Sequence, residues 1–233
     1  MTPDTKPQNL SPNEQQDLDN RLIAAASNGN TATVQTLLAH GADVHARNDH
    51  ALRRAADTGH TETVKVLLAA GADIHAIDDQ ALRWAAEGGC TETVNLLLAH
   101  DADVHALDDG ALRVAVDNGH TETVKALIAS GADVHAEDDW ALRLAAFNSH
   151  LETVQALAKH IFAPDAWRGK SRAEIEAHAT ALYDKIEAEN PQPERLRKAG
   201  TILLDCALCC WEQVRPPPPK LQISPLPAQP RPV

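Results

Sequence analysis

Twelve histidines and four cysteines are the side chains of this 233-residue chain best suited to metal binding or nucleophilic chemistry. Four of the histidines recur every 30 residues, at His45, His75, His105 and His135. A zinc ion needs its ligand atoms within about 4 Å of one another, because each Zn–N bond is about 2 Å long. Packed helices lie about 8–10 Å apart, so histidines that occur once per packed unit cannot easily share an ion. We expect no metal site and no cofactor.

Three of the cysteines lie close together as Cys206-Ala-Leu-Cys209-Cys210, and the fourth is Cys90. The CxxC spacing alone is weak evidence for metal or redox chemistry, because no second pair accompanies it. Cys206 and Cys210 also fall on the apolar stripe of a predicted helix, where thiols act as small core residues. The sequence contains no GxSxG, HExxH or phosphate-loop pattern. We therefore expect no catalytic residues and predict that the protein is not an enzyme.

The elements that position these side chains follow from a repeat of 30 residues. Residues 49–59 read DHALRRAADTG, residues 79–89 read DQALRWAAEGG, and residues 109–119 read DGALRVAVDNG. The same phase extends on both sides and gives five units, which we place in residues 16–165. A fixed period of this size is typical of a stacked repeat array.

Each unit contains two predicted short helices, as the third unit illustrates. Leu82, Ala85 and Ala86 are spaced i, i+3, i+4, and Gly89 stands where a helix C-terminus favours a left-handed residue. Residues 91–100, TETVNLLLAH, repeat the spacing and predict a second helix antiparallel to the first. A hairpin-like loop, DADVHAL, then leads into the next unit.

The repeated aspartates and arginines are interpreted as scaffold. Asp78 or Asp79 is expected to cap the first helix by accepting hydrogen bonds from its first-turn amides. Asp79 also precedes Arg83 by four residues, which is the favourable order for an ion pair on a helix.

These motifs resemble the ankyrin repeat. GADVHA at Gly41 and at Gly131, with the ALRxAA, GHTETV and LLA segments, is similar to the ankyrin consensus GADVNA, TPLHLAA, GHxEIV and LLL. The units are 30 residues long rather than about 33, and ALR replaces TPLH. Short units of this kind resemble those of bacterial and giant-virus ankyrin proteins. The resemblance implies an all-α, ankyrin-type helical solenoid with hairpin-like loops, whose groove and loop tips contact other proteins.

Three further segments flank the predicted array. Residues 1–15 and the proline-rich residues 215–233 lack the apolar pattern of a core and are expected to be disordered. Residues 166–214 contain two predicted helices, the first opened by the capping box SRAE. Their apolar stripes need a surface to bury against, and the open end of the fifth unit supplies one. We therefore expect these helices to cap the array.

The charge of the chain is uneven. Residues 1–160 hold 24 acidic and 11 basic side chains, whereas residues 161–233 hold 9 and 10. An acidic body repels phosphate backbones, which argues against nucleic acid and suits a partner protein with a basic surface. Local geometry at repeat-locked positions is an equally good explanation for many of the acids.

Neither a membrane span nor a targeting segment is predicted. No run approaches the roughly 20 apolar residues that a membrane helix needs, and the N-terminal residues lack the features of a signal peptide. We expect a cytoplasmic protein that is monomeric on its own, with export as an effector as the alternative.

Positions that vary between units predict where a partner binds. They are spaced i, i+4, i+7 on the first helix, away from the fixed apolar stripe, or lie at the loop tips. The predicted partner-binding residues are Arg47, His50, Arg54, Asp57, Ile77, Gln80, Trp84, Glu87, Leu107, Val114, Asp117, Glu137, Trp140, Leu144 and Phe147. Aromatic and arginine side chains dominate binding hot spots, so Trp84, Trp140, Phe147 and Arg54 are the first candidates.

Two other interpretations of these side chains stay open. A tryptophan in an alanine-rich stack could fill the gap between neighbouring first helices. The C-terminal region could equally cover the apolar stripe of the fifth unit, Trp140, Leu144 and Phe147.

We therefore predict a non-catalytic protein–protein interaction module that binds through its first-helix and loop-tip surface. An acidic inhibitor or immunity-type protein and a secreted effector are two sharper versions of this hypothesis. The competing hypothesis is a metal-binding or catalytic protein that uses the histidine-rich loops. A site of that kind would fail on the loss of one histidine, whereas a binding module spreads affinity over several side chains.

Overall fold

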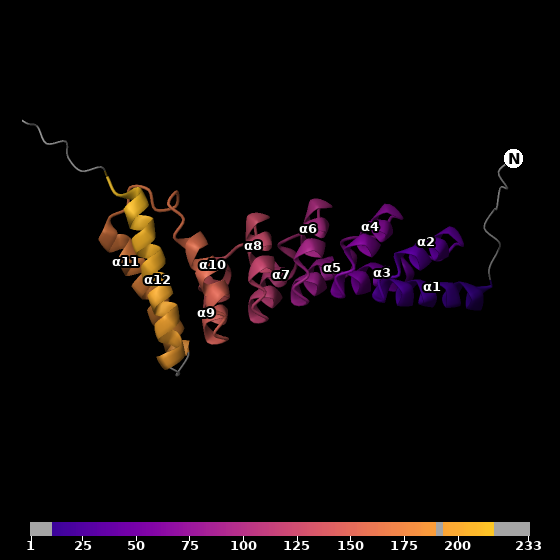
Figure 1. Ribbon diagram of the computed structural model, residues 1–233, viewed down its shortest axis with the longest axis horizontal. Coiled ribbons are helices and arrows are strands. Elements are labelled where there is room, and N and C mark those ends of the chain that lie inside the picture. Colours follow the sequence, from indigo (N-terminus) through magenta and orange to yellow (C-terminus); the bar gives the residue numbers. More distant parts are fainter. Residues whose placement is uncertain (1–10, 190–192, 217–233) are drawn as a thin grey trace, which may run out of the picture.

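The computed structural model describes residues 11–189 and 193–216. Within these ranges the chain forms helices stacked along one elongated array, from α1 at one end to α11 and α12 at the other (Figure 1). Five antiparallel pairs make up the array: α1 (Pro12–Ser27) with α2 (Thr31–Ala39), α3 (Ala46–Asp57) with α4 (Thr61–Ala69), α5 (Ala76–Glu87) with α6 (Thr91–Ala99), α7 (Ala106–Asp117) with α8 (Thr121–Ala129), and α9 (Ala136–Phe147) with α10 (Leu151–Ile161). The predicted all-α solenoid of five units is confirmed.

The core consists of the side chains that the repeat keeps fixed. In the second unit, Leu52, Ala55 and Ala56 of α3 have no exposed surface, and neither have Val64 and Leu67 of α4. Alanines at two positions let the first helices of adjacent units approach closely, while each buried leucine contributes roughly 1.5–3 kcal/mol. The core therefore continues from unit to unit along the array.

Glycine ends each of the three central first helices because two conditions meet there. Gly89 has a φ of 67°, which other residues adopt at a cost. A Cβ atom at Gly89 would also lie 2.6 Å from Nδ1 of His120 in the next unit. The predicted left-handed ending of the first helix is confirmed at Gly89, and the same glycine lets the next unit approach.

The array begins earlier than the sequence predicted. α1 starts at Pro12, so residues 12–15 are helical rather than part of a disordered N-terminus. The cause is a capping box, in which the Ser11 backbone amide donates to Glu14 Oε2 at 2.9 Å. Gln15 then donates to the carbonyl of Gly41 at 3.0 Å, which ties this first turn to the next loop. Residues 1–10 of the predicted disordered segment lie outside the described residues.

α11 (Arg172–Glu189) and α12 (Pro193–Val214) follow the array and pack against each other. Both contact α9, and α12 also contacts α10. Two helices are thus present within residues 166–214, as predicted, and the capping box of Ser171 and Glu174 is present. Their packing is the arrangement that a cap requires, and their stabilising role stays a prediction. Residues 217–233 of the predicted tail are outside the described ranges.

An aromatic cluster joins the last repeat to α11. The indole of Trp167 donates to the carbonyl of Ile161 at 2.8 Å. Its ring lies 5.8 Å from that of Phe162 and 4.9 Å from that of His178. Burial lowers the pKa of His178 below its usual value. The cluster fixes how α11 leaves the array.

Among the helices of the described ranges, none is long and apolar enough to cross a membrane.

Candidate functional site

Each of the three central units opens with three consecutive residues in the left-handed conformation. In the third unit these are Ile77, Asp78 and Asp79, with φ angles of 56°, 54° and 53°. Residues 47–49 and 107–109 adopt the same turn. This conformation costs an L-residue roughly 1–2 kcal/mol, and Asp and Asn tolerate it best. The Asp or Asn pairs at these turns are the sequence signal that could have predicted them.

The aspartate that ends each turn holds the next unit in place. Asp79 is 4% exposed, and its Oδ1 accepts from the backbone amide of Asp103 at 2.8 Å. His75 Nδ1 lies 3.1 Å from the same oxygen. Equivalent bonds join Asp19 to the amide of Asp43, Asp49 to that of Asp73, and Asp109 to that of Asp133. We call these contacts the aspartate ladder.

The ladder corrects two predictions about the scaffold. Asp79 bonds the following loop rather than the first-turn amides of its own helix, so its role as a helix cap is wrong. Arg83 donates to the carbonyls of Ile77 and Asp78 at 3.2 and 3.3 Å, so the predicted ion pair with Asp79 is wrong as well. The arginine instead closes the left-handed turn through these two carbonyls.

The recurring histidines have structural contacts. His45, His75, His105 and His135 each approach the aspartate four residues later, at 2.8–3.1 Å. His120 and His150 use Nε2 to contact the carbonyl of residue 87 or 117 in the preceding unit, at 2.9 and 3.0 Å. Within the described part of the chain, no group of three or more His, Cys, Asp or Glu is placed to hold a metal ion.

A second set of contacts runs along the opposite helices. Threonine hydroxyls of adjacent units pair at 2.8–2.9 Å, from Thr31 with Thr63 to Thr121 with Thr153. The intervening pairs are Thr61 with Thr93 and Thr91 with Thr123. Sequence reasoning missed this ladder, although the TxT spacing in the second helices of the first four units could have indicated it.

The cysteines are all free thiols. Burial raises the pKa of Cys206 and of Cys210, and it raises that of Cys90 together with the nearby charge of Asp57. A raised pKa keeps a thiol in its unreactive protonated form at neutral pH.

Several of the predicted partner-binding residues are engaged within the scaffold. Arg47 donates to Asn20 Oδ1 at 2.8 Å, and Arg54 pairs with Asp57 at 2.6 Å. The Gln80 side chain accepts from Arg53, and that of Asp117 accepts from Asn148 at 2.9 Å. Val114 and Leu144 are half-buried against the core, whereas Glu87 is exposed. The side chain of Glu137 lies outside the described part of the chain.

The two predicted tryptophan anchors are stacked between units. The guanidinium of Arg53 lies 5.5 Å from the ring centre of Trp84, and that of Arg113 lies 5.1 Å from the ring centre of Trp140. Such contacts contribute roughly 0.5–1 kcal/mol at exposed sites. The gap-filling interpretation therefore has direct support for both tryptophans.

Three other predicted residues are large apolar side chains that remain exposed. Ile77, Leu107 and Phe147 have 43%, 53% and 56% of their surface exposed. In the described residues, only one further large apolar side chain is as exposed, Leu204 of α12 at 44%. The described helices α11 and α12 thus leave Phe147 exposed, whereas Trp140 and Leu144 are half-buried against the core.

The electrostatic character of this surface changes along the array. In the second unit, burial and the charges of Arg53, Arg54 and Arg47 lower the pKa of His50. The third and fourth units instead present the exposed acids Asp78, Glu87, Asp108 and Asp117. The surface therefore has a basic end followed by an acidic stretch that contains Ile77 and Leu107.

Comparison with known proteins identifies the architecture. A family model described as ankyrin repeats matches the chain in three copies, over residues 8–78 and 82–168. No curated protein matches the chain. Ankyrin repeats are generally protein–protein interaction modules, and the family is typically non-enzymatic. The matched residues span most of the five helix pairs and more than half of the sequence, so this chain belongs to the ankyrin repeat family.

Proposed function

We propose that this protein is a non-catalytic module that binds another protein through its loop tips and first helices. The observation that carries the proposal is the exposure of Ile77, Leu107 and Phe147. Ile77 and Leu107 also hold left-handed conformations, which are unfavourable for such residues. Apolar side chains that the fold leaves in water, on strained backbone, are candidates for contact with another molecule.

The exposed acids of the third and fourth units favour a partner whose surface is basic where it faces these units. The exposed acids Asp78 and Asp108 follow Ile77 and Leu107 directly in the chain, and the whole chain has a formal net charge of −12. Complementary charge speeds association and selects partners more than it raises affinity. An acidic inhibitor that covers a basic protein surface is the sharper version that this pattern favours. We do not propose a metal or catalytic site in the loops, because the recurring histidines already contact aspartates of the scaffold.

A triple variant tests the proposed surface. Ile77→Ser, Leu107→Ser and Phe147→Ser together should abolish capture of the partner by the immobilised full chain, measured by quantitative mass spectrometry of cell extracts. Each hot-spot truncation can cost about 2 kcal/mol, which is about 30-fold in affinity. Because none of the three side chains belongs to the buried core, the melting temperature should change little.

Leu204→Ser is the matched control, because Leu204 is similarly exposed but lies on α12. A partner that both the wild type and this control capture, and that the triple variant loses, supports the surface. If the triple variant captures the same proteins in the same amounts, the partner binds elsewhere and the proposal is wrong. Trp84→Ala and Trp140→Ala are poorer tests, because they also remove contacts between units.

A further inference from the structure

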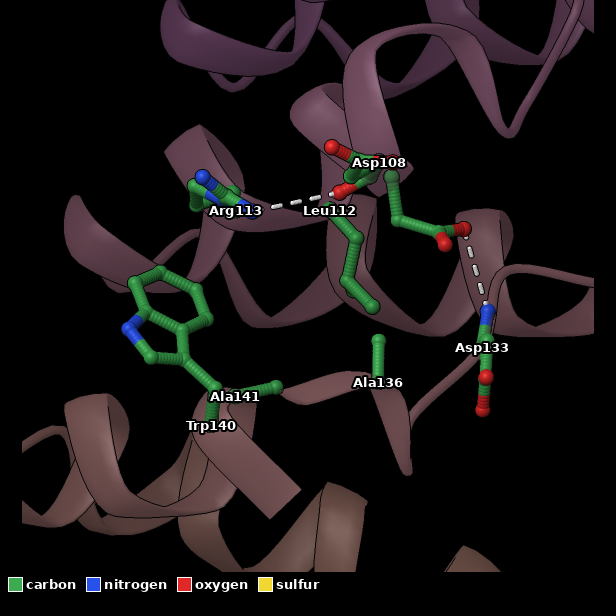
Figure 2. A pocket seen from close by; sticks show the side chains of 8 residues that line it. Asp108, Leu112, Arg113, Asp133, Ala136, Trp140 and Ala141 are labelled. Atoms are coloured by element: carbon green, nitrogen blue, oxygen red, sulfur yellow. Dashed lines mark hydrogen bonds between the residues drawn. The ribbon is translucent and has the colours of Figure 1, made fainter. Parts of the chain in front are cut away.

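A half-open pocket lies at the junction of the fourth and fifth units. Its residues include Asp108, Leu112 and Arg113 from α7, Asp133 from the loop between α8 and α9, and Ala136 and Trp140 from α9. Figure 2 shows that Leu112 and Ala136 point toward each other, with the ring of Trp140 to one side and Asp133 to the other. The pocket therefore combines an apolar floor, an aromatic side and an acidic rim.

The aromatic side of the pocket is held in position. Arg113 stacks over Trp140 at 5.1 Å and donates to the carbonyl of Asp108 at 3.4 Å, a contact drawn in Figure 2. Leu112 is 2% exposed and Trp140 is half-buried against the core. An incoming side chain would thus meet apolar surface that is already ordered, which lowers the entropy cost of binding.

The charge of the pocket favours a cation. Asp108, Asp109 and Asp133 contribute three carboxylates against the single guanidinium of Arg113. The Asp109 carboxylate accepts from the amide of Asp133 at 3.1 Å, and Asp133 Oδ1 accepts from the amide of His135 at 2.8 Å. Asp108 is exposed, and its carboxylate has no bonding partner among the described residues. Asp108 is therefore the acid best placed to meet a ligand.

The tryptophan of this pocket has no counterpart at the equivalent position of the earlier units. Trp140 stands where the second, third and fourth units have His50, Gln80 and Gly110. Gln80 is bonded to Arg53, and Gly110 has no side chain to form a wall. Among the described units, the fifth is thus the one with a tryptophan at this position.

We propose that this pocket receives one lysine or arginine side chain of the partner protein. Its methylene groups would pack on Leu112, Ala136 and Trp140, and its charged end would lie between the carboxylates of Asp108 and Asp133. The inference rests on the proposed binding function and names a chemical group that the partner presents. An apolar stem with a cationic end matches both features of the pocket, because such side chains bury their methylenes and keep the charge in water.

Nuclear magnetic resonance titration of the full chain tests the pocket directly. The probes are acetyl-lysine methylamide and acetyl-arginine methylamide, with acetyl-norleucine methylamide as the uncharged analogue of similar apolar stem. The readout is the indole Nε1–H signal of Trp140, assigned with Trp140→Phe. We expect saturable shifts with a dissociation constant in the millimolar range for at least one cationic probe, and about tenfold weaker binding of the norleucine probe. The two cationic probes distinguish lysine from arginine.

Asp108→Asn should weaken binding of the cationic probe about fivefold, because it removes one charge from an exposed position without disturbing the core. Asp78→Asn, at the equivalent position of the third unit, should leave binding unchanged. Equal binding of the norleucine probe, tighter binding of acetyl-glutamate methylamide, or no shift with about 50 mM of either cationic probe would each overturn the proposal. The capture experiment with Ile77, Leu107 and Phe147 does not depend on this pocket, so the two proposals can fail separately.

Discussion

Replacing Asp79 by alanine tests the aspartate ladder, and the chain provides a closely matched control. Asp78 and Asp79 are adjacent, both acidic and both left-handed, with φ angles of 54° and 53°. The change to alanine therefore has a similar intrinsic conformational cost at both positions. Asp79 is buried and hydrogen-bonded to the next unit, whereas Asp78 is exposed. The difference between the two variants isolates the ladder contact.

The magnitude follows from two contacts of the Asp79 carboxylate. The bond from the amide of Asp103 involves a charged acceptor and contributes about 1.5–3 kcal/mol. The contact with His75 contributes less than about 1 kcal/mol, because the histidine side chain is 56% exposed. We expect Asp79→Ala to lower the free energy of unfolding by about 2–4 kcal/mol and Asp78→Ala by less than about 1 kcal/mol.

Urea unfolding followed by circular dichroism at 222 nm measures both variants. At this chain length, each kcal/mol corresponds to about 2–4 °C in melting temperature, which gives a second readout. The free energies of the wild type and the two variants can be compared only if their m-values are equal, because repeat arrays can lose cooperativity when one interface is weakened. Equal destabilisation by the two substitutions would refute the ladder. Asp79→Asn keeps an acceptor oxygen and should fall between the wild type and Asp79→Ala.

Three further outcomes are expected. Ile77→Asn should raise the free energy of unfolding by up to about 1 kcal/mol in urea titrations, because asparagine tolerates the left-handed conformation better than isoleucine does. Removal of residues 166–233 should lower the melting temperature and cause self-association in size-exclusion chromatography, whereas removal of residues 217–233 should change neither. Burial lowers the pKa of His178, so the unfolded chain binds the extra proton, and stability should be lost as the pH falls below about 6.5. His178→Gln should flatten this pH dependence in urea titrations.

The fold could be predicted from the sequence because each unit states the same pattern independently. Leu82, Ala85 and Ala86 have helical spacing, and the same spacing recurs at the same phase in each of the remaining four units. Packing then has one consistent solution, since each apolar stripe can only bury itself against the equivalent stripe of its neighbour. The ends of the array depend on local caps instead, and the capping box at Ser11 placed the start of α1 earlier than periodicity alone indicated.

The left-handed turns were harder to predict, because they are recognised by their backbone angles and the residues at them have a second common explanation. A pair of acids before a helix has an ordinary explanation as a cap, and that explanation fits helix electrostatics equally well. Only the three-dimensional path shows that the carboxylate of Asp79 reaches forward to Asp103, 24 residues later in the chain. A fixed residue in a repeat can therefore serve the junction between units rather than its own unit.

Variation between units also proved an incomplete guide to the binding surface, and the arginines show why. Arg53, Arg83 and Arg113 recur at one position, but their neighbours in the next unit differ. Arg53 lies over Trp84, and Arg113 lies over Trp140. Arg83 packs beside Gly110 instead, so closely that a Cβ atom added to this glycine would lie 3.0 Å from Arg83 Cδ.

Each of these variable residues fits a constant neighbour, so its variation needs no external partner. Ile77, Leu107 and Phe147 are different, because more than two fifths of the surface of each residue remains in water. Affinity for a partner should therefore depend more on these three residues than on Trp84. At Trp140, the face toward the pocket is the part that a partner can use, while the contact with Arg113 keeps the ring in place.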